Sequence, residues 1–137
     1  VDIMSDWSFE EKVKYIDDRL SEYLESLGYQ RNQRIVDHLI GTAYILRDMG
    51  ALPHLVDAGL FHSVYGEASS RISPPNSLIE RREVQEVVGK QAEEIVYHFC
   101  TIPNPRTENI LAMEHSQLRD DLIMLCKAND QEMGSSQ

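Results

Sequence analysis

Two stretches decide the fold of this chain, His38-Leu-Ile-Gly-Thr-Ala-Tyr-Ile-Leu-Arg-Asp-Met-Gly50 and Val56-Asp-Ala-Gly-Leu-Phe-His62. In the first, apolar residues recur at the spacing of one helix face, and Gly50 ends the run. The second is apolar almost all round, which indicates a central, buried helix. His38 lies beside the apolar stripe of the first helix, and His62 closes the second. We therefore expect two neighbouring buried helices that hold a pair of histidines.

Helical patterns also occupy the rest of the chain. A capping box that starts at Ser8 and the apolar residues after it predict a cover helix over about residues 8–27. The core is expected over about residues 31–133, and residues 134–137 are expected to form a frayed tail. No alternating strand pattern of useful length is found. The fold class is therefore all-α, a compact bundle of five to seven helices in a single domain over residues 1–137.

The second half of the chain predicts further helices separated by breaks. A helical region starts near Leu78, and Gly89 divides it into a short piece and a longer one over residues 90–100. A loop rich in serine and proline precedes it over residues 68–77. The last long helix is expected over about residues 116–133.

The composition is that of a globular protein. Hydrophobic residues make up 42% and charged residues 26%, and no apolar run approaches the ~18 residues of a membrane span. The chain starts without a signal-peptide pattern, and Cys100 and Cys126 lie in apolar contexts typical of reduced core thiols. We therefore expect a cytoplasmic protein. The net charge of −10 argues against nucleic acid and anionic membranes as general partners.

The order of these motifs resembles that of the HD-domain metallohydrolases, most closely the hydrolase domain of RelA/SpoT-type alarmone enzymes. In that family a histidine opens an apolar helix, and a second histidine, followed by aspartate, ends the next. A short helix rich in valine and alanine and a closing helix come later, and residues 87–96 and 124–129 resemble them. The resemblance covers about residues 31–132. It implies an HD-like helical fold and, in the family's active members, a divalent metal that acts on a phosphoester.

The chain departs from the family pattern at the metal-binding aspartates. The two histidines carry over as His38 and His62, but the first aspartate corresponds to Ser63 and the distal one to Asn129. Because Mn²⁺ and Mg²⁺ favour anionic oxygen ligands, this neutral set predicts weak Mn²⁺ binding. The alternative is a softer ion such as Zn²⁺ or Ni²⁺, held by His38 and His62.

Three residues are candidates for catalysis, His62, Ser63 and Glu67. The Glu-Asp pair that handles water in the family corresponds to Gly66 and Glu67, so Glu67 is the acid that remains for acid–base chemistry. Ser63 lacks the turn and the orienting acid of an activated serine, so a hydrogen-bonding role is favoured over a nucleophilic one. Either Glu67 or Glu132 would supply a carboxylate to a metal if the geometry shifted.

Four residues are candidates for ligand contact, Arg34, His38, Tyr65 and Asn129. Arg34 precedes His38 by one helical turn, and Tyr65 lies at the mouth of the second helix. The alternative for the histidines is a buried pair that is hydrogen-bonded within the core. A bond from the Asn129 amide to either histidine or to Ser63 would equally explain a polar residue on an apolar helix face.

These observations predict a divergent HD-like domain that has lost classical Mn-dependent phosphohydrolase activity. It would bind a small molecule or a protein partner through His38, His62, Ser63 and Asn129, without nucleic acid or membrane. No cofactor is expected, and one divalent transition metal is the alternative. The alternative function is a divergent HD-family enzyme that uses metal-assisted phosphoester hydrolysis or His/Glu acid–base chemistry in the same pocket.

Overall fold

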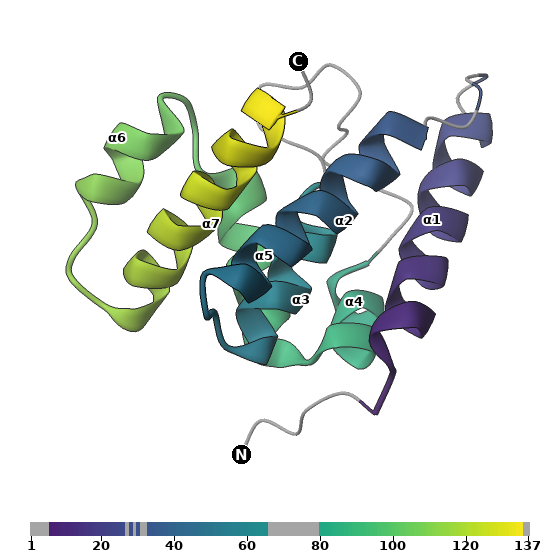
Figure 1. Cartoon of the computed structure of the whole chain (residues 1–137), viewed down its shortest axis with the longest axis horizontal. Helices are drawn as coiled ribbons and strands as arrows, with labels where there is room; N and C mark the ends of the chain where they lie inside the picture. The colour runs from purple at the N-terminus through teal and green to yellow at the C-terminus, as the bar shows by residue number, and fades with distance from the viewer. Residues whose placement is uncertain (1–5, 27, 29, 31–32, 66–79, 136–137) are drawn as a thin grey trace.

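The computed structural model describes residues 6–26, 28, 30, 33–65 and 80–135, which form a bundle of helices (Figure 1). The helices are α1 (Phe9–Ser26), α2 (Gln33–Asp48), α3 (Pro53–Phe61), α4 (Arg81–Val88), α5 (Lys90–Thr101), α6 (Arg106–Leu111) and α7 (Gln117–Ser135). These seven helices, with no strand in the described part of the chain, confirm the predicted all-α class and the predicted number of helices.

Helix α3 is the centre of the bundle. All of its residues from Leu55 to Phe61 are buried, as expected for a helix that is apolar almost all round. Helices α2, α5 and α7 pack against it, and α2 also packs along α7. Helix α1 lies at the edge beside α2, and α6 packs on α7 at the opposite edge (Figure 1). The end of α3 is therefore enclosed by α2, α5 and α7.

The close approach of α2 and α3 depends on Gly59. A Cβ atom at this position would lie 2.4 Å from Leu46 Cδ1 on α2, far inside van der Waals contact. Leu46 is fully buried, so its side chain would have to shift against its packed neighbours. The absence of a side chain at Gly59 therefore allows the two helices that carry the histidines to pack together.

Several helix ends lie where the sequence predicts them. The Ser8 N–H donates to Glu11 Oε1 at 2.9 Å and the Glu11 N–H donates to Ser8 Oγ at 3.1 Å, which confirms the capping box. Gly89, with a φ of +89°, separates α4 from α5 as predicted. Helix α7 continues to Ser135, so the predicted tail begins too early, and the sequence pattern does not predict α6. The loop and the helix start expected within residues 66–79 lie outside the described residues.

Two further predictions concern the thiols and the membrane. Cys100 and Cys126 are buried and form no disulfide with each other, as predicted for core cysteines. Each helix in the described ranges is too short or too polar to cross a bilayer.

Candidate functional site

The structure brings His38 and His62 into direct contact. His38 lies on α2 and His62 caps the C-terminus of α3, and their Nε2 atoms are 3.2 Å apart. The two rings meet edge to face, with centroids 5.0 Å apart. The packing of α2 on α3 thus places two imidazole nitrogens, 24 residues apart in the chain, at one point.

The outer nitrogens of both rings are held by hydrogen-bond acceptors. His62 Nδ1 lies 2.6 Å from the Gly59 carbonyl oxygen, and His38 Nδ1 lies 3.1 Å from Glu132 Oε1 on α7. A carbonyl and a carboxylate both accept, so each Nδ1 donates its proton. Both rings are therefore fixed with Nδ1–H directed outward and Nε2 directed toward the other ring.

Asn129 of α7 supplies a third polar atom, its Oδ1, 2.7 Å from His38 Nε2. With Nδ1 protonated, neutral His62 offers only a lone pair at Nε2, and the Asn129 oxygen also accepts. His38 Nε2 therefore faces two acceptors. This arrangement is satisfied if the Asn129 amide turns so that its N–H donates to His38 Nε2, or if a metal ion binds the three atoms.

His62 is the neutral member of the pair. It is fully buried, and this burial is the main cause that lowers its pKa from 6.5 to about 4. The positive charges of His38 and Arg106 lower the pKa further, while hydrogen bonds to Gly59 and Asn129 oppose the shift. A neutral His62 at pH 7 agrees with an Nε2 atom that accepts a hydrogen bond or binds a metal.

The residues present do not suit Mn²⁺ or Mg²⁺. No group of three His, Cys, Asp or Glu side chains that could hold a metal occurs among the described residues. The converging donors are two imidazole nitrogens and one amide oxygen, without an anion. They suit a softer ion better, because two nitrogens that bind one zinc ion at about 2.0–2.1 Å with tetrahedral geometry lie about 3.3 Å apart.

The other predicted site residues differ in where they lie. Ser63 is half-buried next to His62, and Arg34 is exposed at the start of α2. Glu67 lies outside the described residues, as does Gly66. Glu132, which the sequence suggests only as an alternative metal ligand, instead bonds the outer nitrogen of His38. Its spacing of three residues from Asn129 on one helix is the signal that places both on the same face.

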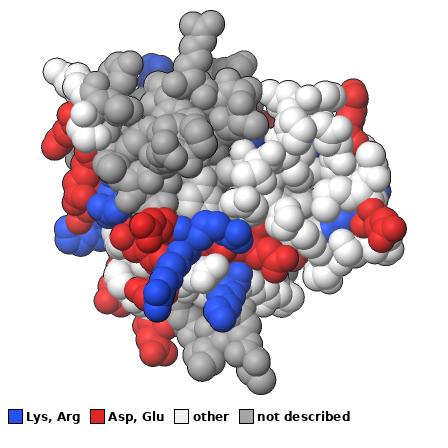
Figure 2. All heavy atoms as spheres, turned by 180° about the vertical axis from the view of Figure 1, so that it is seen from behind, with Lys and Arg blue, Asp and Glu red and all other residues white. Residues whose placement is uncertain are grey.

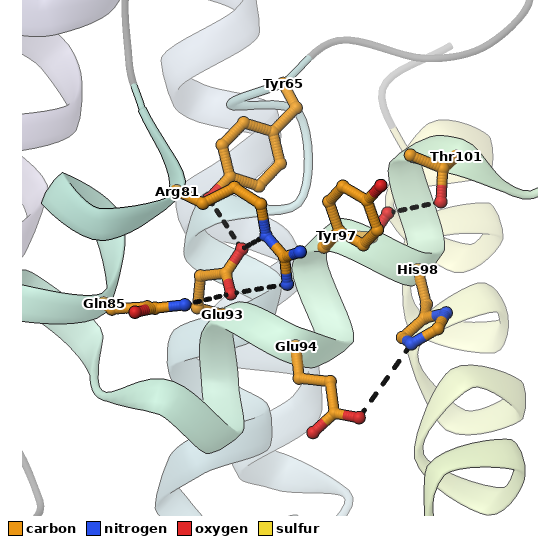
Figure 3. Close-up of polar contacts among 8 residues, drawn as sticks. All are labelled: Tyr65, Arg81, Gln85, Glu93, Glu94, Tyr97, His98 and Thr101. Atoms are coloured by element: carbon orange, nitrogen blue, oxygen red, sulfur yellow. Dashed lines mark hydrogen bonds and ion pairs between the residues drawn. The ribbon is translucent and has the colours of Figure 1, made fainter.

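Tyr65 belongs to a second polar cluster, which is centred on Glu93 of α5 (Figure 3). The buried Glu93 carboxylate accepts hydrogen bonds from Tyr65 Oη at 2.8 Å, from Arg81 at 2.8 and 3.0 Å, and from Gln85 Nε2 at 3.0 Å. Burial acts to raise the pKa of Glu93, but these bonds outweigh it and lower the pKa. Arg81 also stacks on the Tyr97 ring, with its guanidinium carbon 3.6 Å from the centroid.

A third polar group joins α1 and α7 to α3. Lys12 Nζ lies 2.8 Å from Asp57 Oδ2 in a buried ion pair, and His54 Nε2 lies 3.1 Å from Asp121 Oδ2. The sequence pattern does not reveal these pairs, because each joins residues at least 45 positions apart. They hold the N-terminal half of α3, away from the histidine pair at its C-terminus.

Residues 23–104 match a family model described as a domain of unknown function (DUF6817). The matched range contains α2 to α5, and therefore His38, His62 and Glu93, and it ends before α7. No curated protein and no solved structure matches the chain.

Proposed function

Because the chain belongs to the DUF6817 family, whose description names no activity, we propose a function from the arrangement of its own residues. The protein is a divergent HD-like domain that lacks Mn-dependent phosphohydrolase activity and binds a ligand at His38, His62 and Asn129. One observation carries this proposal. Asn129 Oδ1 lies 2.7 Å from His38 Nε2, so a neutral amide faces the histidine where the resemblance implies an aspartate.

The neutral amide argues against the family's hydrolysis. A metal-activated water needs an ion that is held firmly beside the phosphoester, and Mn²⁺ is held firmly by carboxylates. The Glu132 carboxylate bonds the far side of His38, away from the nitrogen that faces Asn129. The group keeps its hydrogen-bonding atoms and part of its access to solvent, since the His38 side chain is 18% exposed. These properties favour binding over phosphoester hydrolysis.

The charge distribution supports a partner other than nucleic acid. The chain carries a net charge of −10, and on the face shown in Figure 2 the Lys and Arg side chains lie among Asp and Glu side chains. A surface of this kind does not attract a polyanion. Two reduced, buried thiols favour a reducing compartment such as the cytoplasm. The proposed ligand is therefore a small molecule or a protein segment.

The test combines an activity assay with a binding assay. We expect no hydrolysis of a chromogenic phosphodiester with Mn²⁺ above the level of a His62→Ala variant. In an NMR screen of small polar molecules, we expect ligands that shift the ring signals of His38 and His62 and that bind Asn129→Leu at least tenfold more weakly. Lys127→Ala, an exposed change on the same helix, should bind as the wild type does. Mn-dependent turnover that His62→Ala abolishes would disprove the proposal.

A second candidate function is a site for one divalent transition metal. Two observations favour it, the 3.2 Å separation of the Nε2 atoms and the acceptors on both Nδ1 atoms. Histidines that bind metals usually donate their other ring N–H to a carboxylate or a backbone carbonyl, as both do here. In this candidate His38, His62 and Asn129 would hold the ion, which would act as a Lewis acid when bound.

Metal titration separates the two candidates. The chain, purified without chelator and dialysed against Zn²⁺, Ni²⁺ and Mn²⁺ in turn, would retain one equivalent of Zn²⁺ or Ni²⁺, and His62→Ala would abolish this retention. The double change Ser63→Asp with Asn129→Asp would add Mn²⁺ binding. If neither the wild type nor the double variant retains any of the three metals, the metal candidate is wrong.

A further inference from the structure

Glu132 lies at the outer edge of the histidine group, one helical turn beyond Asn129 on α7. Its Oε1 atom is 3.1 Å from His38 Nδ1, and both side chains are largely buried, at 17% and 18% exposure. Asn129 and Glu132 therefore contact opposite nitrogens of the same ring. Helix α7 holds the imidazole of α2 from both sides.

Gly41 makes room for this contact. A Cβ atom at position 41 would lie 2.5 Å from Glu132 Oε2 and 3.0 Å from its Cδ, so the carboxylate lies directly against the bare backbone of α2. Glycine within a helix costs about 1 kcal/mol relative to alanine. The approach of Glu132 gives a physical reason for a glycine here, three residues after His38, in an otherwise regular helix.

We infer that Glu132 is a positioning residue of the histidine site and that Gly41 is the residue that lets it act. The Glu132 carboxylate fixes His38 with Nδ1–H outward, so that Nε2 is directed at His62 and Asn129. It also supplies a negative charge next to the two imidazoles and the Asn129 amide, which makes the site selective for a cation over an anion. The inference rests on the proposed function, because it describes how the same site is held in place and which charge it accepts.

NMR of the imidazole rings at one fixed pH near 7, with chelator present, tests the positioning directly. In the wild type we expect a His38 Nδ1–H signal that is protected from solvent exchange. Glu132→Ala should remove it, and Gly41→Ala, which leaves Glu132 in the chain but displaces it, should do the same. Glu132→Gln retains an acceptor oxygen and should keep the signal. Asp130→Asn, an exposed change on α7, should leave it unaltered.

Co²⁺ binding, followed by its absorption spectrum, tests the charge. Loss of an outer hydrogen-bond partner of a metal-binding histidine typically lowers affinity by about 10–100-fold, and we expect this for Glu132→Ala and Gly41→Ala. Glu132→Gln should also bind more weakly, because it lacks the charge. A bound phosphate or sulfate at the histidines would contradict the cation preference.

The two assays separate failure of this inference from failure of the proposed function. If wild-type His38 shows the protected Nδ1–H signal and Glu132→Ala and Gly41→Ala retain it, Glu132 does not position the ring, whatever the site binds. If the variants lose the signal but neither Co²⁺ nor any small molecule binds the wild type, the positioning stands and the proposed function fails. Should Gly41→Ala not fold, Glu132→Ala and Glu132→Gln still decide the result.

Discussion

The Glu93 carboxylate shows how much one buried side chain organises in this small protein. Tyr65 precedes the segment 66–79, and Arg81 follows it at the start of α4. Both donate hydrogen bonds to Glu93 on α5, as Gln85 does (Figure 3). Because Tyr65 lies three residues after His62, in the turn that follows α3, Glu93 also anchors the chain just after the histidine site.

Replacing Glu93 with glutamine should destabilise the fold by about 2–3 kcal/mol, because Arg81 loses its charged acceptor and one amide N–H is brought against other donors. Arg81 remains half exposed to water, which keeps the loss below that of a fully buried ion pair. Urea unfolding at pH 7 measures the change. Glu94→Gln, the neighbouring and exposed position, should stay within about 0.5 kcal/mol of the wild type. Equal losses for the two variants would show that the Glu93 bonds add no stability.

At the residue scale, the sequence predicts the histidine pair better than its surroundings. The spacing of His38 and His62 on two apolar helices is a local pattern, and the structure buries His62 fully and His38 in large part. Glu132 and Asn129 reach His38 from 94 and 91 positions away, so their contacts depend on the rotation of α7 against α2. Helical periodicity gives the face of a helix, but not which atom of a side chain meets which nitrogen.

At the element scale, Gly59 marks a close approach between α2 and α3. Gly59→Ala should lower stability by about 1–3 kcal/mol, because the new methyl group overlaps the buried Leu46 side chain. Chemical denaturation of Gly59→Ala, Leu46→Ala and the double variant measures the coupling. We expect the double variant to be more stable than the sum of the two single changes predicts, since Leu46→Ala removes the overlapping atoms.

The matched control for Gly59 is Gly134 near the end of α7. No atom lies within 4 Å of a Cβ at Gly134, so alanine there should leave stability unchanged or raise it slightly. If Gly59→Ala also leaves stability unchanged, α2 and α3 do not pack as closely as described.

Helix α1 is attached to α3 through the buried pair of Lys12 and Asp57. Lys12→Met should cost about 3 kcal/mol, because Asp57 is left buried without its cation. Burial already raises the pKa of Asp57, while Lys12 opposes this rise. Thermal unfolding measures the loss, and Lys14→Met, which removes an exposed partner of Asp18, is the matched control. A double change, Lys12→Met with Asp57→Leu, should recover most of the lost stability, because no buried charge is left unpaired. Similar losses for Lys12→Met and Lys14→Met would show that the Lys12–Asp57 pair does not attach α1 to α3.

Element boundaries follow the local chemistry of the chain closely where a glycine or a capping box marks them. Gly89 and Ser8 give the start of α5 and α1 because their conformations are set by neighbouring residues. The six-residue helix α6 has too few positions to show a periodic pattern, so its sequence cannot be distinguished from a loop. The end of α7 is set by continued helical hydrogen bonding through Gly134 rather than by a stop at that glycine.

At the scale of the whole molecule, the histidine site draws on elements from the second helix to the last. Residues on α2, at the end of α3 and on α7 meet there, and α5 contributes Phe99 and Cys100 against His62. His62 therefore lies where the main packing surfaces of the bundle converge. A positive charge on buried His62 would lower the free energy of unfolding of the whole bundle.

Acid should therefore unfold the protein partly through His62. In the unfolded chain this histidine takes up a proton below about pH 6.5, whereas burial lowers its pKa in the folded protein to about 4. Between these values the unfolded state binds more protons, so the free energy of unfolding falls as the pH falls. The stability that depends on neutral His62 is fully present above pH 6.5, and about 3 kcal/mol of it should be lost by pH 4.

Urea unfolding from pH 7 to 4.5, with chelator present, measures how the free energy of unfolding changes with pH. In His62→Gln the free energy of unfolding should fall less steeply as the pH falls. Carboxylates still titrate in both proteins, so some dependence on pH remains. The control His115→Gln, at an exposed histidine, should show the same dependence on pH as the wild type. Equal slopes for His62→Gln and the wild type would mean that His62 is protonated in the folded protein, and the hydrogen bonds assigned to its Nε2 atom would then be wrong.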